Sequence, residues 1–338
     1  MTFSKACYKL LTITILLFSL TFTFLAGNAE YADECRTESG DPSCHNNKIA
    51  KKLKLIAIPS ILVANMIGVS LPLLSRFIPV LGPDRDMFVI VKSLASGVIL
   101  KTGFMHVLPD SYDDLTSKCL PEEPWRKFPF STFIATVSAL LALMIDSYAM
   151  RTSKREGEAV PLENGSNSVH TQEKVNDDKT SQLLRNSVIA LVSELGIVVH
   201  SVVIGLAMGA SDNQCTIRSL IAALCFHQLV EGMRLGGSIL QAELKSKMNW
   251  IMVFSFPVTT QVGIGLGMKI QKIYDETSPT ALIVVGILNA CSAGLLMHMA
   301  VVNFLAHEFF GRPKKIHFLG YVAVFIGVGG MSLMAKWA

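Results

Sequence analysis

The sequence is poor in charged residues. Of its 338 residues 17% are charged and 51% are hydrophobic, whereas soluble domains carry about 25% charged residues. A soluble protein of this length would need a polar surface that this composition does not supply. The mean hydropathy of +0.45 points the same way. The composition therefore excludes an ordinary soluble fold and favours a polytopic helical membrane protein.

Features of several other protein classes are missing as well. The net charge is only +4, and the basic residues stand in short clusters, so the continuous basic face of a nucleic-acid-binding protein is absent. The sequence has no phosphate-binding loop, and the glycines of 263–267 follow no strand, so they make no dinucleotide site. The segment beginning His307-Glu308 lacks the second histidine of a zincin helix. We therefore predict a protein that is not an enzyme, carries no cofactor and binds no nucleic acid.

Long apolar runs are what the sequence has in abundance. A hydrocarbon core of about 30 Å needs roughly 20 apolar residues per helix. Runs without Asp, Glu, Lys or Arg cover 55–75, 128–145, 250–268, 277–306 and 316–335. Apolar runs that contain ionisable residues cover 87–109, 186–211 and 216–240. None alternates as the strands of a barrel would, so we predict an all-α polytopic membrane protein with eight transmembrane helices.

A shorter apolar run precedes these spans. It covers about residues 10–25, follows two lysines, and ends near the small residues Gly27 and Ala29, which suit signal peptidase. We predict a cleavable signal peptide at 1–29; the alternative is an uncleaved first helix. Cleavage places the new N-terminus outside, and eight spans then place the C-terminus outside too. The distribution of lysine and arginine favours this orientation only slightly.

One polar segment interrupts the spans. Residues 151–182 are rich in Ser, Asn, Glu, Asp and Lys and cannot bury a core. The glycosylation sequon at Asn164 lies within it and would go unused in the cytosol. We therefore predict four regions: the signal peptide 1–29, an exterior segment with helices 1–3 at 30–150, a cytosolic variable loop at 151–185, and helices 4–8 at 186–338.

The cysteines give an independent indication of sidedness. One of the seven lies in the predicted signal peptide and two lie inside spans. The other four fall on the predicted exterior side: Cys35, Cys44, Cys119 and Cys215. An even set on the oxidising face predicts two disulfides. Cys35–Cys44 with Cys119–Cys215 is the favoured pairing, and free thiols are the alternative.

Ionisable residues inside the spans are functional hypotheses, because burying a charge in a bilayer costs free energy. His227 and Glu231 are four residues apart and share a helical face, and an imidazole with a carboxylate makes half of a divalent-metal site. His200 in the preceding run supplies a second imidazole. Such mixed ligation suits Zn, Fe(II) or Mn, and the alternative is that these are hydrogen-bonded packing residues.

Small residues are expected to bring those two helices together. Glycines allow close helix approach in membranes, and both runs contain several of them: Gly196, Gly205, Gly209, Gly232, Gly236 and Gly237. We predict that these glycines let the two helices pack closely on one another. The ligands His200, His227 and Glu231 would then converge at mid-depth.

Further ionisable residues stand near the ends of the second and third spans. His106 and Asp110 are four apart at the exterior end of the second span, and acidic residues follow them. An acidic mouth would concentrate cations; the alternative is a solvated loop. Asp146 lies near the cytosolic end of the third span, where it serves transport or simply snorkels. Glu194 is six residues before His200 and does not share its face.

Longer motifs follow one another along most of the chain. They include His200-Ser201-Val202-Val203-Ile204-Gly205, Phe226-His227-Gln228 with Glu231-Gly232-Met233, and Gly103-Phe104-Met105-His106-Val107-Leu108-Pro109-Asp110. In these motifs the sequence resembles the ZIP family of zinc and iron transporters, most closely its plant iron-regulated branch. The resemblance implies eight helices, both termini outside, and import of Zn²⁺ and/or Fe²⁺ into the cytosol as substrate. It also implies an elevator-like movement of the metal-bearing helices.

The resemblance also implies which residues bind the metal, which partners the protein has and where it is located. The metal site between the fourth and fifth helices would use His200, Ser201, His227, Gln228 and Glu231, and further functional positions would be His106, Asp110 and Asp146. Its partners would be divalent metal ions and the lipid bilayer, with a homodimer left open. The plasma membrane is the expected location, with an endosomal or other endomembrane as the alternative.

Several residues depart from the family pattern, and two of them bear on transport. Arg234 stands where members usually have Gly, and Asn303 where they usually have Asp. Arg234 is three residues after Glu231 on the same helical face, so we expect its guanidinium to pair with that carboxylate; the alternative is a partner in Glu194 or backbone carbonyls. These departures leave a second function open, that of a transport-impaired relative acting as a regulatory or heteromeric partner.

Overall fold

The structure is a computed structural model, and part of the chain is described. The described residues are 44, 46–74, 85–158, 187, 190–191, 194–242, 246–271, 278–301 and 314–335. The predicted signal peptide, Cys35, Asn164 and Asn303 lie outside them, as does the predicted variable loop beyond residue 158.

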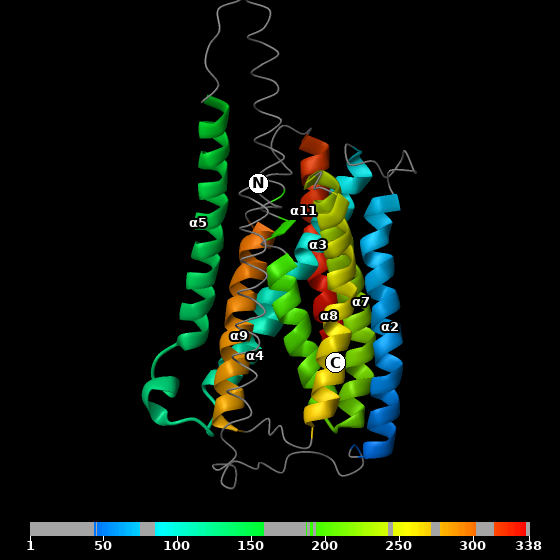
Figure 1. Cartoon of the computed structure of the whole chain (residues 1–338), viewed down its shortest axis with the longest axis vertical. Helices are drawn as coiled ribbons and strands as arrows, with labels where there is room; N and C mark the ends of the chain where they lie inside the picture. The colour runs from blue at the N-terminus through cyan, green and yellow to red at the C-terminus, as the bar shows by residue number, and fades with distance from the viewer. Residues whose placement is uncertain are drawn as a thin grey trace, which may run out of the picture.

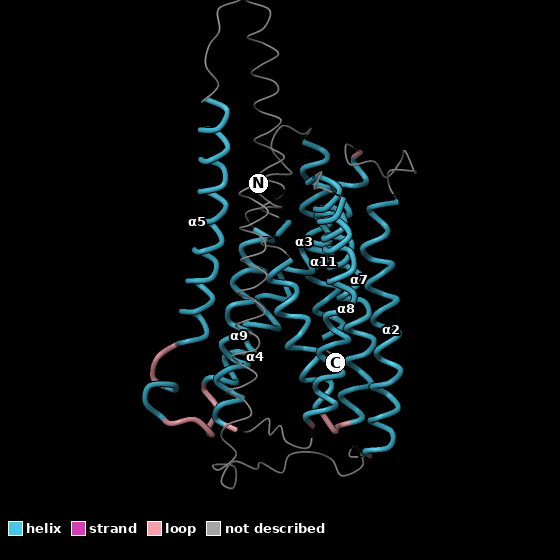
Figure 2. Tube along the Cα trace, in the orientation of Figure 1, coloured by secondary structure: helices cyan, strands magenta, loops and turns pink. Residues whose placement is uncertain are grey.

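The described elements are helices, as the apolar runs predict (Figure 1 and Figure 2). They are α2 (Asn47–Leu74), α3 (Asp86–Thr102), α4 (Leu108–Leu115), α5 (Phe130–Glu158), α7 (Gln214–Ala242), α8 (Ser246–Ile270), α9 (Pro279–His298) and α11 (Lys314–Ala335). The π-helical segments are η3 (Gly103–Val107) and η4 (Glu122–Arg126). A further apolar helix, here called the 194–210 helix, covers Glu194–Ala210.

Among the described residues, six helical stretches are long and apolar enough to cross a membrane. They are Asn47–Leu74, Asp86–Leu115, Phe130–Ser147, Lys247–Ile270, Pro279–Val301 and Lys314–Leu333. Large apolar side chains such as Met144 and Phe325 are exposed on them, as contact with lipid requires. The chain is therefore a multi-pass helical membrane protein, and the predicted count of eight spans stays a prediction.

The helices form two groups. In the first, α2 packs along α7 and against α8, while in the second α3 packs on α11 and both α5 and α4 pack on α9. The groups meet where α3 contacts α7. Figure 1 shows α5 beside α9 at one side and α2 beside α7 at the other. The meeting of α3 and α7 is where the candidate site lies.

The glycines lie at close helix contacts, but not at the predicted ones. A Cβ on Gly209 would lie 2.3 Å from the carbonyl oxygen of Ile264 in α8, and a Cβ on Gly236 would lie 2.4 Å from that of Val69 in α2. Other glycines face α9, α8, α2 and α3: Gly196, Gly205, Gly232 and Gly237. The prediction that they join the 194–210 helix to α7 is therefore wrong, because their small faces turn toward other neighbours.

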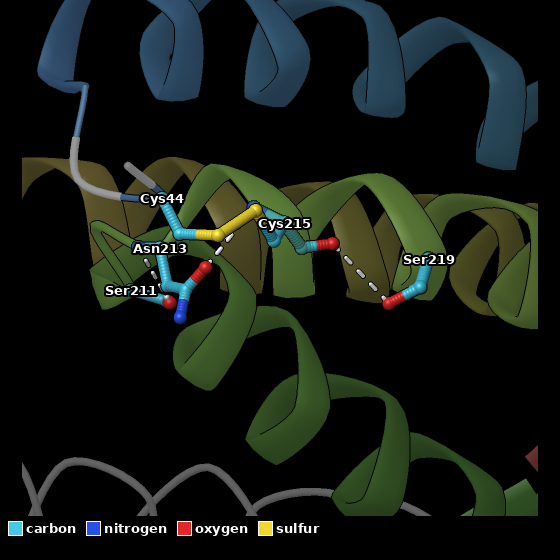
Figure 3. The surroundings of a disulfide bond; sticks show 5 residues. All are labelled: Cys44, Ser211, Asn213, Cys215 and Ser219. Carbon is cyan, nitrogen blue, oxygen red and sulfur yellow. Dashed lines mark hydrogen bonds between the residues drawn. A yellow bond between two sulfur atoms is a disulfide. The ribbon is translucent and has the colours of Figure 1, made fainter. Parts of the chain in front are cut away.

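A disulfide joins the beginnings of α2 and α7 (Figure 3). It links Cys44 to Cys215 across 171 residues, so neither Cys44 nor Cys215 has its predicted partner. The predicted pairing is therefore wrong. The reason is tertiary: α2 and α7 pack along their length and begin at the same end, so Cys44 meets Cys215 despite the intervening chain. Both cysteines do belong to the set predicted for the exterior face.

A buried lysine ties the same end of the first group together. Lys54 is 1% exposed, and its ammonium donates to the carbonyl oxygen of Gly209 at 2.7 Å and to Oε1 of Gln271 at 3.3 Å. The amide of Gln271 in turn donates to Asp212. A buried charge is tolerated only when its donors are satisfied. These bonds fix α2 against the 194–210 helix and the end of α8.

Candidate metal site

Three buried side chains converge between the 194–210 helix and α7. His200 comes from the first helix, and His227 and Glu231 come from adjacent turns of the second. One ligand atom from each lies within 4.8 Å of the others. The two imidazole centroids are 5.4 Å apart with the rings nearly perpendicular, and all three residues are buried. The cluster therefore presents two nitrogens and a carboxylate to one point.

A threonine on α3 determines which ring nitrogen of His227 carries the hydrogen. The hydroxyl of Thr102 donates its single hydrogen to the carbonyl oxygen of Val98 at 2.9 Å and lies 3.2 Å from Nδ1 of His227. Because the hydroxyl already donates its one hydrogen to Val98, it can only accept at the contact with His227. Nδ1–H of His227 therefore donates to the oxygen of Thr102. In a neutral imidazole the other nitrogen then has no proton. Nε2 of His227 is therefore left with a lone pair for a metal.

The remaining donor atoms have the geometry of ligands that share an ion. Nε2 of His227 lies 3.1 Å from Oε1 of Glu231, close to the separation of two ligands that each stand about 2.0–2.2 Å from one tetrahedral ion. Among the described residues, neither nitrogen of His200 and neither oxygen of Glu231 has a hydrogen-bond partner. Buried polar atoms are normally satisfied, so unpaired acceptors that face one another favour a cation between them.

The predicted residues Ser201 and Gln228 lie beside the cluster and cross-link its helices. Both are fully buried. The amide nitrogen of Gln228 donates to Oγ1 of Thr260 in α8 at 2.7 Å and to Oγ of Ser201 at 3.3 Å. Its oxygen has no hydrogen-bond partner among the described residues. Gln228 therefore positions α7 against two neighbouring helices and still has one oxygen to offer.

The predicted pair at the exterior end of the second span comes together on one face. Nδ1 of His106, in η3, lies 3.5 Å from Oδ2 of Asp110, and both side chains are part-exposed. His106 also interacts electrostatically with His227. Buried Lys101 lies one turn before and interacts electrostatically with Asp110. This pair thus interacts with the buried cluster through His227 and with the exposed acidic segment that follows it, Asp113 to Glu123, through Asp113.

Asp146 belongs to a separate buried pair and does not snorkel. Its Oδ2 lies 3.4 Å from Nε2 of His298, and the two residues join α5 to α9. Both are buried. Glu194 accepts a hydrogen bond from Ser255 of α8 and stands apart from the three converging ligands.

Three polar residues of this region were not predicted from the sequence. Thr102 orients His227, Thr260 holds Gln228, and His298 pairs with Asp146. Thr102 immediately precedes the motif that contains His106, and no spacing rule links it to a histidine 125 residues away. Their roles depend on which helices are neighbours.

Comparison with known proteins decides the family. A family model described as "ZIP Zinc transporter" matches residues 51–335. The chain belongs to the ZIP family. This ZIP protein is 74% identical over 366 residues to "Zinc transporter 7" of Arabidopsis thaliana, with 100% of both chains covered. It is 50% identical over 347 residues to "Fe(2+) transport protein 1" of the same plant, with 99% of each covered.

A relative from rice is similar over most of its length as well. The ZIP protein is 48% identical over 343 residues to "Fe(2+) transport protein 1" of Oryza sativa subsp. japonica, covering 92% of this chain and 91% of that one. The family resemblance carried by the motifs is therefore confirmed, and it extends over nearly the whole chain.

Replacing Thr102 by valine should weaken metal binding without displacing a ligand. Valine keeps the shape but removes the acceptor for Nδ1–H, so the imidazole of His227 loses its fixed tautomer and orientation. Removing such an outer partner typically costs about 10–100-fold in metal affinity. Titration of the purified ZIP protein with Zn²⁺ measures the effect. Thr102→Ser retains the hydroxyl and should bind as the unmodified protein does; equal affinity in the valine variant would contradict the tautomer assignment.

Proposed function

We propose that this ZIP protein imports a divalent transition metal, Zn²⁺ and/or Fe²⁺, across its membrane into the cytosol. The observation that carries the proposal is the buried convergence of His200, His227 and Glu231 with their ligand atoms within 4.8 Å. Two imidazoles and one carboxylate suit both ions and do not discriminate strongly between them. The names of the relatives, which include zinc transporters and Fe(2+) transport proteins, support the same two substrates.

The proposed ligand set suits transport better than permanent storage. Structural zinc sites close the coordination sphere with four protein ligands, commonly thiolates. Here the three side chains include no thiolate, which leaves room for water and for release. Ser201 and Gln228, which directly follow His200 and His227, are proposed to complete or support this site.

We propose a path that leads to this site from outside and away from it toward the cytosol. His106 and Asp110 would receive the ion beside the exposed acidic segment, and the electrostatic interaction of His106 with His227 supports their proximity. Asp146, paired with His298 between α5 and α9, would act on the cytosolic side. Side chains from both helix groups would thus contact the ion in turn.

The proposed topology has eight spans after a cleaved signal peptide at 1–29. The 194–210 helix and α7 would be the fourth and fifth spans, and both termini would be outside. The exterior segment with helices 1–3 would end at about residue 150, and the variable loop 151–185 would separate it from helices 4–8 at 186–338. The disulfide at the beginnings of α2 and α7 supports an oxidising exterior at that end.

A tag placed within residues 159–182 should be reachable by antibody only after the cells are permeabilised. This segment is polar, and the predicted loop 151–185 that contains it holds six lysine and arginine residues, which favour the cytosolic side. Asn164 should also carry no glycan, because glycosylation occurs on the opposite side of the membrane. Immunofluorescence on intact and permeabilised cells, with a tag at the proposed mature N-terminus as the control, makes the comparison. Staining of the loop tag on intact cells would reverse the topology.

One observation, the burial of Arg234, favours a second function in which the protein regulates another transporter. Arg234 is a buried cation on the helix that carries His227 and Glu231, and it would favour a transport-impaired relative that regulates or joins another transporter. A homodimer and residence in the plasma membrane are part of the primary proposal. Uptake of radiolabelled Zn²⁺ and Fe²⁺ by cells lacking their own importers separates the two functions. Saturable accumulation above vector-only cells supports import, and none at confirmed surface expression supports the regulatory role.

A further inference from the structure

Arg234 is a buried charge next to the proposed metal ligands. Its side chain is 1% exposed, and it stands three residues beyond Glu231, on adjacent turns of α7. A guanidinium stays protonated in proteins. In a membrane span such a charge is costly and is retained where it acts on a pathway. The position therefore raises the question of what this cation does to an incoming dication.

The contacts of Arg234 differ from those predicted from the sequence. One guanidinium nitrogen donates to Sδ of buried Met299 at 3.3 Å, and the charge interacts electrostatically with Glu231. The carboxylate of Glu231 accepts no hydrogen bond from the described residues. The predicted pairing with Glu231 is therefore electrostatic, and no hydrogen bond from Arg234 occupies these oxygens. Met299 directly follows α9, so this contact joins α7 to the end of α9.

We propose that Arg234 is a fixed internal cation that weakens metal binding at His200, His227 and Glu231 and thereby promotes release. This inference rests on the proposed function. At short range in a low-dielectric interior, charges interact far more strongly than in water. The guanidinium repels a dication and at the same time stabilises the ionised, metal-free carboxylate of Glu231. Both effects lower affinity, and neither requires Arg234 to displace a ligand.

The direction of α7 places this charge on the release side. The helix begins at the end that carries the Cys44–Cys215 disulfide, proposed to be exterior, and Arg234 follows Glu231 along it. Arg234 therefore stands on the cytosolic side of the ligands, where its charge lowers their affinity for a bound dication. A site with this charge should bind more weakly than the same ligands without it.

Zn²⁺ titration of the purified full chain, together with uptake kinetics, tests the proposal. Arg234→Met keeps an unbranched side chain without charge, and Arg234→Gly removes the side chain. Both should lower the Kd and the KM by about tenfold, the change that about 1.4 kcal/mol produces, and both should raise uptake at subsaturating metal without raising the maximal rate. Arg234→Lys keeps the charge and should stay within about twofold of the unmodified protein.

Arg218→Met is the matched control. It removes the same charge from the same helix at an exposed position, thirteen residues and therefore about 20 Å from Glu231 along the axis. Its Kd should be unchanged. A tenfold gain in this variant as well would assign the effect to net charge and overturn the proposal.

Each of the other possible outcomes would overturn either the inference about Arg234 or the proposed function. Equal or weaker binding in both neutral variants, at normal size-exclusion behaviour, would overturn the inference, as would a lysine variant that behaves like methionine. Failure of both neutral variants to fold would assign Arg234 a structural role and would also overturn it. Absence of Zn²⁺ binding and of uptake by the unmodified protein would instead refute the proposed function.

Discussion

Replacing His227 by alanine should abolish saturable metal uptake while the protein still reaches the membrane. The alanine variant loses the Nε2 lone pair that Thr102 prepares and that faces Glu231 at 3.1 Å. No other described side chain offers an imidazole to the cluster besides His200. Loss of an outer partner already costs about 10–100-fold in metal affinity, so loss of a ligand should cost at least about 100-fold. Radiolabelled Zn²⁺ uptake, normalised to surface-biotinylated protein, measures the effect.

His317→Ala is the control for that variant. His317 lies on α11 and contacts the ring of Tyr321, outside the metal cluster, so its removal should leave uptake kinetics unchanged. Unmodified kinetics in His227→Ala, at matched surface expression, would refute the ligand assignment.

Replacing Gly209 by valine should prevent the protein from folding. A Cβ there would lie 2.3 Å from the carbonyl oxygen of Ile264 and 2.9 Å from the Cα of Gly267. Both are backbone atoms of α8 and cannot move aside singly. The cost should exceed the about 1–3 kcal/mol typical of overpacking, and separation of the helices would also displace His200. The yield of monodisperse protein in size-exclusion chromatography is the measurement.

Gly265 offers a matched comparison on α8. A Cβ at this position meets no atom within 4 Å, so Gly265→Val should give a normal yield. Both variants add the same side chain to a helical glycine, and they differ in whether backbone stands opposite. Equal yields from Gly209→Val and Gly265→Val would contradict the close contact between the 194–210 helix and α8.

Local patterns account for what the sequence predicted well. Apolar runs predict helices because every backbone polar group must be satisfied inside a bilayer. The spacing of His227 and Glu231 places both on one helical face without any knowledge of neighbouring helices. His200 is a separate case, because its place beside them depends on a second helix. The family resemblance, rather than spacing, supplied that neighbour.

Properties that depend on which helices touch could not be predicted. The glycines of α7 look suited to any close partner, and only the structure shows that Gly232 and Gly236 face α2. The disulfide could not be predicted for the same reason. Cys44 reaches Cys215 because α2 packs on α7. Helical spacing placed Arg234 near Glu231 but could not show that its guanidinium donates to Met299 beyond the end of α9.

X-ray absorption at the zinc edge, on the full chain loaded with one equivalent of Zn²⁺, tests the central claim most directly. The scattering pattern of imidazole counts histidine ligands, and zinc lies about 2.0–2.1 Å from nitrogen but about 2.3 Å from sulfur. We predict nitrogen and oxygen neighbours with two imidazoles, falling to one imidazole in both His200→Ala and His227→Ala. An unchanged imidazole count in either variant, or a sulfur shell in the unmodified protein, would contradict the assignment of His200, His227 and Glu231 as the metal ligands.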